Sequence, residues 1–200
     1  MTPERTHAWR LAVWILIASE ALLFAGLFAL YAGYRAEYAG AFARCATHSV
    51  QWMGGANTMI LIASSFAIAW AGLEARRKHE RVVVRWLALA AALGVAFVAI
   101  KLAEWHVHLS EGIVAGAGGH GPDEGRGTQL FFTLYYLMTG LHLFHLVVAL
   151  ALVAWLIALV RGGRAARHLV TLELVALYWN FVDLIWMFLW PMFYLLRGDT

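Results

Sequence analysis

Five long apolar runs, separated by short polar segments, divide the chain. They cover residues of about 10–34, 54–74, 86–109, 128–160 and 169–196. Each run can cross the hydrocarbon core of a bilayer, which takes roughly 20 helical residues. An isolated strand leaves backbone groups unsatisfied in lipid, so each run is predicted to be a helix. The pattern therefore predicts an all-α membrane protein, in which a bundle of five transmembrane helices forms one domain over residues 1–200.

Composition and charge agree with this class. The chain is 62% hydrophobic and 14% charged, whereas soluble domains carry about 25% charged residues. Ten Lys and Arg residues fall in the N-terminal segment and the second and fourth connections, against four in the first and third connections and the C-terminal segment. The positive-inside rule then predicts a cytoplasmic N-terminus and a C-terminus on the periplasmic side. The basic residues are therefore explained by membrane topology, and nucleic acid is not an expected partner.

The first apolar run carries a carboxyl group, Glu20, among almost exclusively apolar neighbours. Helical rise places it roughly 13 Å from the cytoplasmic end of its span. An ionised carboxylate at that depth costs several kcal/mol, so Glu20 is expected to be protonated and to face another helix or a lipid headgroup. An ionisable group inside a membrane is a functional-site hypothesis by default.

Polar groups also interrupt the other spans. Lys101, Glu104 and His108 are three and four residues apart, which places them on one helical face as a local charged chain. Polar side chains inside spans can also serve only to hold helices together. The remaining candidate positions are Asn57, His142, His145, Glu173, Asn180 and Asp183.

The histidines invite a haem or metal hypothesis. His142 lies roughly 20 Å down its span, whereas His106 and His108 lie near an outer end, so they cannot bind one haem together. His142 and His145 share a helix and cannot be trans axial ligands. These two residues and a carboxylate of another helix could form a metal site. We favour the alternative, in which both histidines are structural and hydrogen-bonded, and assign no metal site. Cys45 is the only cysteine; it is expected to be an incidental loop residue.

Five stretches in order resemble subunit III of haem-copper terminal oxidases, in the five-helix form of the cytochrome c and quinol oxidase family. The resemblance covers essentially the whole chain. The stretches are Ile17–Phe24 (S-E-x-x-x-F), Asn57–Ser65 (N-T-x-x-L-x-x-S-S), Lys101–Trp105 (ending in E-W), Thr139–His145 (T-G-x-H-G-x-H) and Glu173–Trp186 (E-x-x-x-x-Y-W-H-F-V-D-x-x-W). Two positions depart from these patterns: Leu143 stands where the family has Gly, and Asn180 where it has His.

The resemblance implies a subunit without redox centres, in a bacterial inner membrane. It packs beside catalytic subunit I, and subunit II is a further expected partner; these subunits hold the haem and copper. It binds phospholipid and supports sustained O2 reduction and proton uptake. An accessory protein of a nitric oxide reductase is the alternative within this reading. The two alternative classes are a haem-b electron carrier and a small transporter built on Glu20, Lys101, Glu104 and Asp183.

Two groups of site residues follow. The resemblance implies that Glu20 is the carboxyl that reacts with hydrophobic carbodiimide, which requires the protonated acid. Basic residues at the inner span ends attract anionic headgroups at about 1 kcal/mol per charge. Lipid is therefore expected between the first helices and on the surface toward the catalytic partner. The basic positions are Arg10, Arg76, Arg77 and Arg81.

Overall fold

A computed structural model describes residues 3–48, 51–110, 125–162 and 168–195 of the chain. Every regular element in these ranges is helical. The helices are α1 (Pro3–Glu37), α2 (Ala39–His48), α3 (Gln51–Arg76), α4 (Glu80–Ser110), α5 (Arg126–Arg161) and α6 (Leu169–Trp190), followed by a single π-helical turn, η2 (Pro191–Leu195). The predicted all-α class is confirmed.

The five predicted spans are confirmed as α1, α3, α4, α5 and α6, each long and apolar enough to cross a membrane. The 36 residues of α5 extend over about 54 Å, which exceeds the thickness of a bilayer core. Beyond α6 the chain continues through Pro191 into η2. Proline lacks the N–H of the regular helical ladder, and a wider turn accommodates that loss.

Helix α2 was missed by the sequence analysis. Its ten residues are too few and too mixed in polarity to register as an apolar run. The helix buries Phe42, Cys45 and Ala46 on one side and exposes Arg44. The expectation that Cys45 is an incidental loop residue is therefore wrong, because its side chain is 4% exposed within the core.

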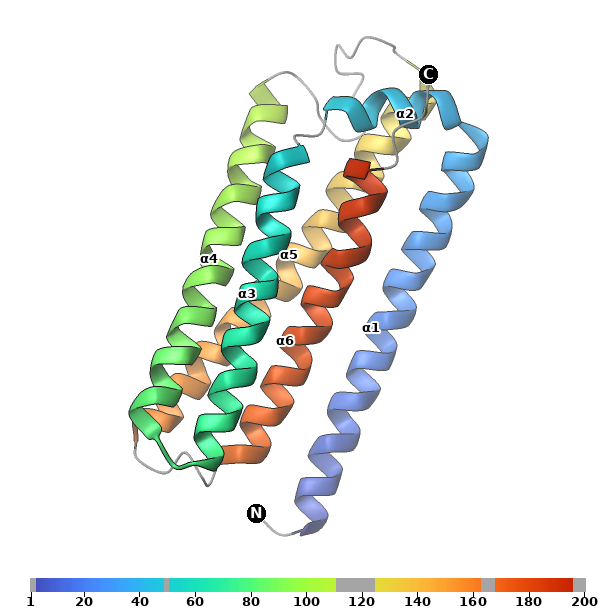
Figure 1. The fold of residues 1–200 in the computed structure, drawn as a ribbon. Coiled ribbons are helices and arrows are strands. Elements are labelled where there is room, and N and C mark those ends of the chain that lie inside the picture. The colour runs from blue at the N-terminus through green and yellow to red at the C-terminus, as the bar shows by residue number, and fades with distance from the viewer. Residues whose placement is uncertain (1–2, 49–50, 111–124, 163–167, 196–200) are drawn as a thin grey trace.

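Four helices form a ring in which α3 packs against α4 and α6, and α5 packs against the same two helices. Helix α1 lies outside this ring, against α5 and α6 (Figure 1). Helix α6 thus separates α1 from α3. The start of α1 and the end of η2 lie at opposite ends of the bundle (Figure 1).

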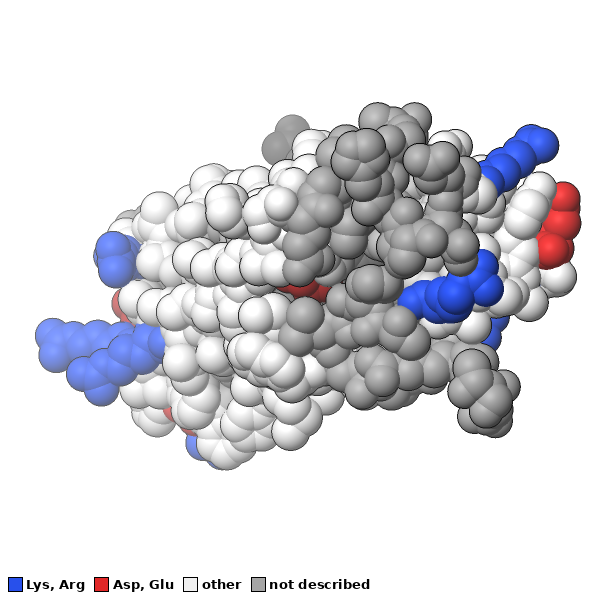
Figure 2. Space-filling view, turned by 90° about the horizontal axis from the view of Figure 1, so that it is seen from above, with Lys and Arg blue, Asp and Glu red and all other residues white. Residues whose placement is uncertain are grey.

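The buried face of α4 shows how the ring is specified. Its buried residues alternate at spacings of three and four, from Val83 through Gly94 to His108, which defines one continuous helical stripe. Gly94 is required for close packing, because a Cβ there would lie 2.8 Å from Cη2 of Trp179 on α6. Seen from the α2 end, the described surface between the peripheral charged side chains is mostly uncharged (Figure 2). On the sides of the bundle, exposed positions such as Leu22, Val95 and Val147 are apolar, as expected of helices that face lipid.

Candidate functional site

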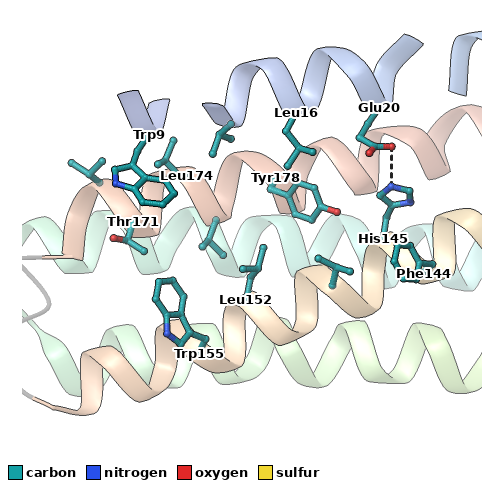
Figure 3. A pocket seen from close by; sticks show the side chains of 14 residues that line it. Trp9, Leu16, Glu20, Phe144, His145, Leu152, Trp155, Thr171, Leu174 and Tyr178 are labelled. Carbon is teal, nitrogen blue, oxygen red and sulfur yellow. Dashed lines mark hydrogen bonds and ion pairs between the residues drawn. The ribbon is translucent and has the colours of Figure 1, made fainter. Parts of the chain in front are cut away.

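An apolar groove of about 440 Å³ runs between α1, α5 and α6. Trp9 and Trp155 line one end, and Glu20 and His145 lie at the other (Figure 3). The walls between them are almost wholly apolar and include the ring of Tyr178. The groove therefore leads from the end of the bundle where α1 begins to a single polar pair.

The polar pair joins two distant parts of the sequence. Nε2 of His145 lies 2.9 Å from Oε2 of Glu20, and Nδ1 of the same ring lies 2.7 Å from the carbonyl oxygen of Leu141. Since a carbonyl oxygen only accepts, Nδ1 carries a hydrogen. One proton is then shared along the Glu20–His145 contact, as carboxylic acid with neutral imidazole or as carboxylate with imidazolium. In either form the pair is neutral overall, which is how a titratable couple is accommodated inside a membrane.

The surroundings of the pair are apolar. The Glu20 side chain is 21% exposed and that of His145 is 7% exposed. The rings of Phe24 and Phe144 each have a centroid 5.6 Å from that of His145, in edge-on arrangements. Glu20 therefore has a protein partner, and part of its side chain still borders the groove.

A second polar cluster is enclosed in the ring, toward the α2 end. Nζ of Lys101 donates to Oε2 of Glu104 at 3.2 Å and to the hydroxyls of Tyr135 and Tyr194 at 2.8 Å each. Both tyrosine hydroxyls in turn donate to Oε1 of Glu104, at 2.7 and 2.5 Å. All three ammonium hydrogens are used, and Lys101 and Glu104 are each 1% exposed. The predicted Lys–Glu contact is present; the two tyrosines were missed because they come from other helices.

Two further predicted site residues, His142 and Asn57, are buried in the interior of the bundle. His142 packs against the rings of Phe97 and Trp186, at centroid distances of 5.6 and 5.3 Å. Its two ring nitrogens, and both amide atoms of buried Asn57, have no hydrogen-bond partner among the described residues. His142 and His145 thus occupy separate environments. Among the described residues, no three His, Cys, Asp or Glu side chains come close enough to hold a metal ion.

Asp183 belongs to a polar group between α3 and α6. Its Oδ2 accepts a short hydrogen bond from Ser65 and a longer one, 3.4 Å, from Ser64. Ser64 also accepts from Nε1 of Trp179 at 3.1 Å. Asn180, one helical turn before Asp183, is exposed on the outside of the bundle.

Glu173 lies near the start of α6 and connects three helices. It accepts from Arg10 of α1 at 3.3 Å and from Arg76 of α3 at 2.9 Å. Arg77 instead pairs with Glu74 at 2.9 Å. Three of the four arginines proposed to attract lipid therefore already contact carboxylates. Helix α6 lies between the first two spans, α1 and α3, and the apolar groove lies between α1, α5 and α6.

Comparison with known proteins places the chain. The family model described as "Cytochrome c oxidase subunit III" matches residues 2–197. A cytochrome c oxidase subunit 3 of Synechocystis sp. is 29% identical over 91% of this chain and 73% of its own length. A probable cytochrome c oxidase subunit 3 of Mycobacterium tuberculosis is 30% identical over 92% of this chain and 85% of its own length. A heme-copper oxidase subunit I+III of Aeropyrum pernix is 26% identical over 93% of this chain and 22% of its own length. The chain belongs to the cytochrome c oxidase subunit III family.

Proposed function

We propose that this protein is the non-catalytic subunit III of a bacterial haem-copper respiratory oxidase, located in the inner membrane. It packs beside subunit I, with subunit II as a further neighbour, and supports sustained O2 reduction and proton uptake. The observation that carries the proposal is the Glu20–His145 hydrogen bond at the end of the apolar groove, in a chain matched along nearly its whole length by the subunit III family.

The Aeropyrum pernix relative supports the choice of partner, since its name joins subunits I and III. In this proposal the haems and copper of the complex belong to the partner subunits. The test is purification through a tag on this chain. A haem-bearing partner with oxidase activity is expected, whereas recovery of the chain with a nitric oxide reductase alone would refute the proposal. A His142→Ala variant should leave the haem spectrum of the complex unchanged.

We propose that the Glu20–His145 pair maintains oxidase activity during prolonged turnover and takes no part in each catalytic cycle. Glu20→Gln keeps the shape and a hydrogen-bond donor toward His145, so assembly should be nearly unchanged. Glu20→Ala should leave the initial oxidase rate close to normal but hasten the loss of activity during turnover. An immediate collapse of the initial rate in Glu20→Gln, with the complex intact and fully haem-loaded, would show that Glu20 carries protons in the cycle and would refute this role.

The groove is proposed to hold a phospholipid acyl chain along its apolar wall. Arg10, one residue beyond Trp9, lies at the end where a headgroup would sit. Native mass spectrometry of the complex should detect phospholipid that survives detergent exchange. Widening the groove with Trp155→Ala should release it, while Trp70→Ala on α3, outside the groove, should not. Equal retention in both variants would reject this seat.

The orientation is proposed from the distribution of basic residues. In a Cys45→Ser background, Ser110→Cys at the end of α4 should react with a membrane-impermeant thiol reagent added from the periplasmic side. Lys78→Cys, in the turn between α3 and α4, should react only after the membrane is opened. The reverse pattern would invert the proposed topology.

A further inference from the structure

A second groove opens on the outside of the bundle between α3 and α6. It encloses about 400 Å³, and its lining includes Thr58, Ser65, Asn180 and Asp183 among apolar side chains. It lies on the opposite side of α6 from α1, so the groove beside Glu20 is a separate feature.

The polar residues of this α3–α6 groove lie deep in the bilayer. Asn180 and Asp183 follow the start of α6 at Leu169 by about 16 and 21 Å of helical rise. Ser65 precedes the end of α3 at Arg76 by about 16 Å. All three are therefore close to the middle of a hydrocarbon core of about 30 Å.

The hydrogen bonds of this group are incomplete. Oδ2 of Asp183 is used by Ser65 and Ser64, but Oδ1 has no partner among the described residues, although the side chain is only 6% exposed. Asn180 is exposed and lines the groove. Hydrocarbon chains offer nothing to these groups, and an unsatisfied polar group in lipid is costly. A partner that brings hydrogen-bonding side chains to the same depth would satisfy these groups.

We propose that the α3–α6 groove is the docking site for a transmembrane helix of the catalytic subunit, which places a hydrogen-bonding side chain against Oδ1 of Asp183 and the amide of Asn180. The inference rests on the proposed function and adds which face meets the partner. Polar contacts of this kind join helices in membranes where apolar surfaces alone give no preference. Around them, exposed Phe66 and Met187 supply apolar contact area. By contrast, outward positions on other helices, such as Leu22, Val95 and Val147, are apolar.

Photocrosslinking in the purified complex tests this assignment. A benzophenone amino acid replaces either Met187 or Phe66 at the groove, or Leu22, Val95 or Val147 on other faces; all five side chains are 51–76% exposed. Reaction with the haem-bearing subunit is expected from Met187 and Phe66 in higher yield than from any control position. Yields at Met187 and Phe66 no higher than at the controls would overturn the assignment. Crosslinks from Met187 and Phe66 to lipid alone would overturn it as well.

A substitution at Asn180 gives an independent readout. Asn180→Leu removes the amide and should weaken retention of the subunit by roughly 3- to 30-fold, measured as dissociation during detergent dilution. Asn180→His, which keeps a hydrogen-bonding group, should retain the subunit like the parent. Unchanged retention in Asn180→Leu would overturn the proposal. If the parent chain captures no haem protein, the proposed function itself fails; if it captures one that links only from other faces, the function stands and the docking site alone fails.

Discussion

Removing one charge from the enclosed Lys101–Glu104 pair should be far more harmful than removing both. Glu104→Gln keeps the shape of the side chain and an oxygen for the two tyrosines, but it leaves the Lys101 ammonium without a counter-charge. Lys101→Met leaves the Glu104 carboxylate held only by Tyr135 and Tyr194. Because both side chains are 1% exposed, neither orphaned charge gains hydration.

The size of each penalty has a ceiling, since the orphaned group can lose its charge. At pH 7, neutralising a free lysine side chain costs about 4.6 kcal/mol, and neutralising a glutamate costs about 3.7 kcal/mol. Each single variant should therefore lose about 3–4 kcal/mol of unfolding free energy, in the range seen when a buried pair is broken. The double variant Lys101→Met/Glu104→Gln leaves no charge and keeps the amide near both hydroxyls, so it should lie within about 1 kcal/mol of the parent.

The measurement is reversible unfolding in mixed dodecylmaltoside–SDS micelles, followed by tryptophan fluorescence. The four proteins form a double-mutant cycle with an expected coupling energy of at least about 5 kcal/mol. Additive losses, with the double variant less stable than either single variant, would refute the reasoning. Losses below about 1 kcal/mol in both single variants would show that the cluster is hydrated in the membrane-embedded protein.

Two further predictions concern packing and the groove pair. Gly94→Ala should lower the unfolding free energy by about 1–3 kcal/mol, because its Cβ would lie 2.8 Å from a ring carbon of Trp179. Gly26→Ala is the matched control and should be neutral or stabilising, because nothing lies within 4 Å of that position. Equal losses in the two variants would contradict the packing argument. Glu20→Ala and His145→Ala should each destabilise the isolated subunit by about 1–3 kcal/mol while the double variant costs little more than one single, so strict additivity in the same unfolding assay would exclude a shared proton.

Local composition was enough to locate the five spans, because the need to satisfy backbone groups in lipid leaves a long apolar run few alternatives. Helix α2 lacks such a constraint. Its helical state depends on burying Phe42 and Cys45 against neighbours that the sequence does not identify.

The contacts of the candidate site residues also differ in whether the sequence predicts them. The Lys101–Glu104 contact could be predicted, because a spacing of three residues on one helix fixes it. Its tyrosines, Tyr135 and Tyr194, are 31 and 90 positions from Glu104. Single positions on separate helices carry no signal of which faces will meet. Glu20 was identified by its chemistry alone, and its partner His145 only through the packing of α1 on α5.

The placement of α1 outside the ring has a consequence for biogenesis. Among its described side chains, only Ile17, Phe24 and Tyr31 are buried. The histidine that shares a proton with Glu20 lies 125 positions later in the chain. During translation α1 therefore enters the bilayer long before α5 is synthesised. Until then Glu20 cannot form its hydrogen bond with His145. An ionisable group without a partner is costly in lipid, and α1 acquires the hydrogen-bonded partner of Glu20 only when the later helices arrive.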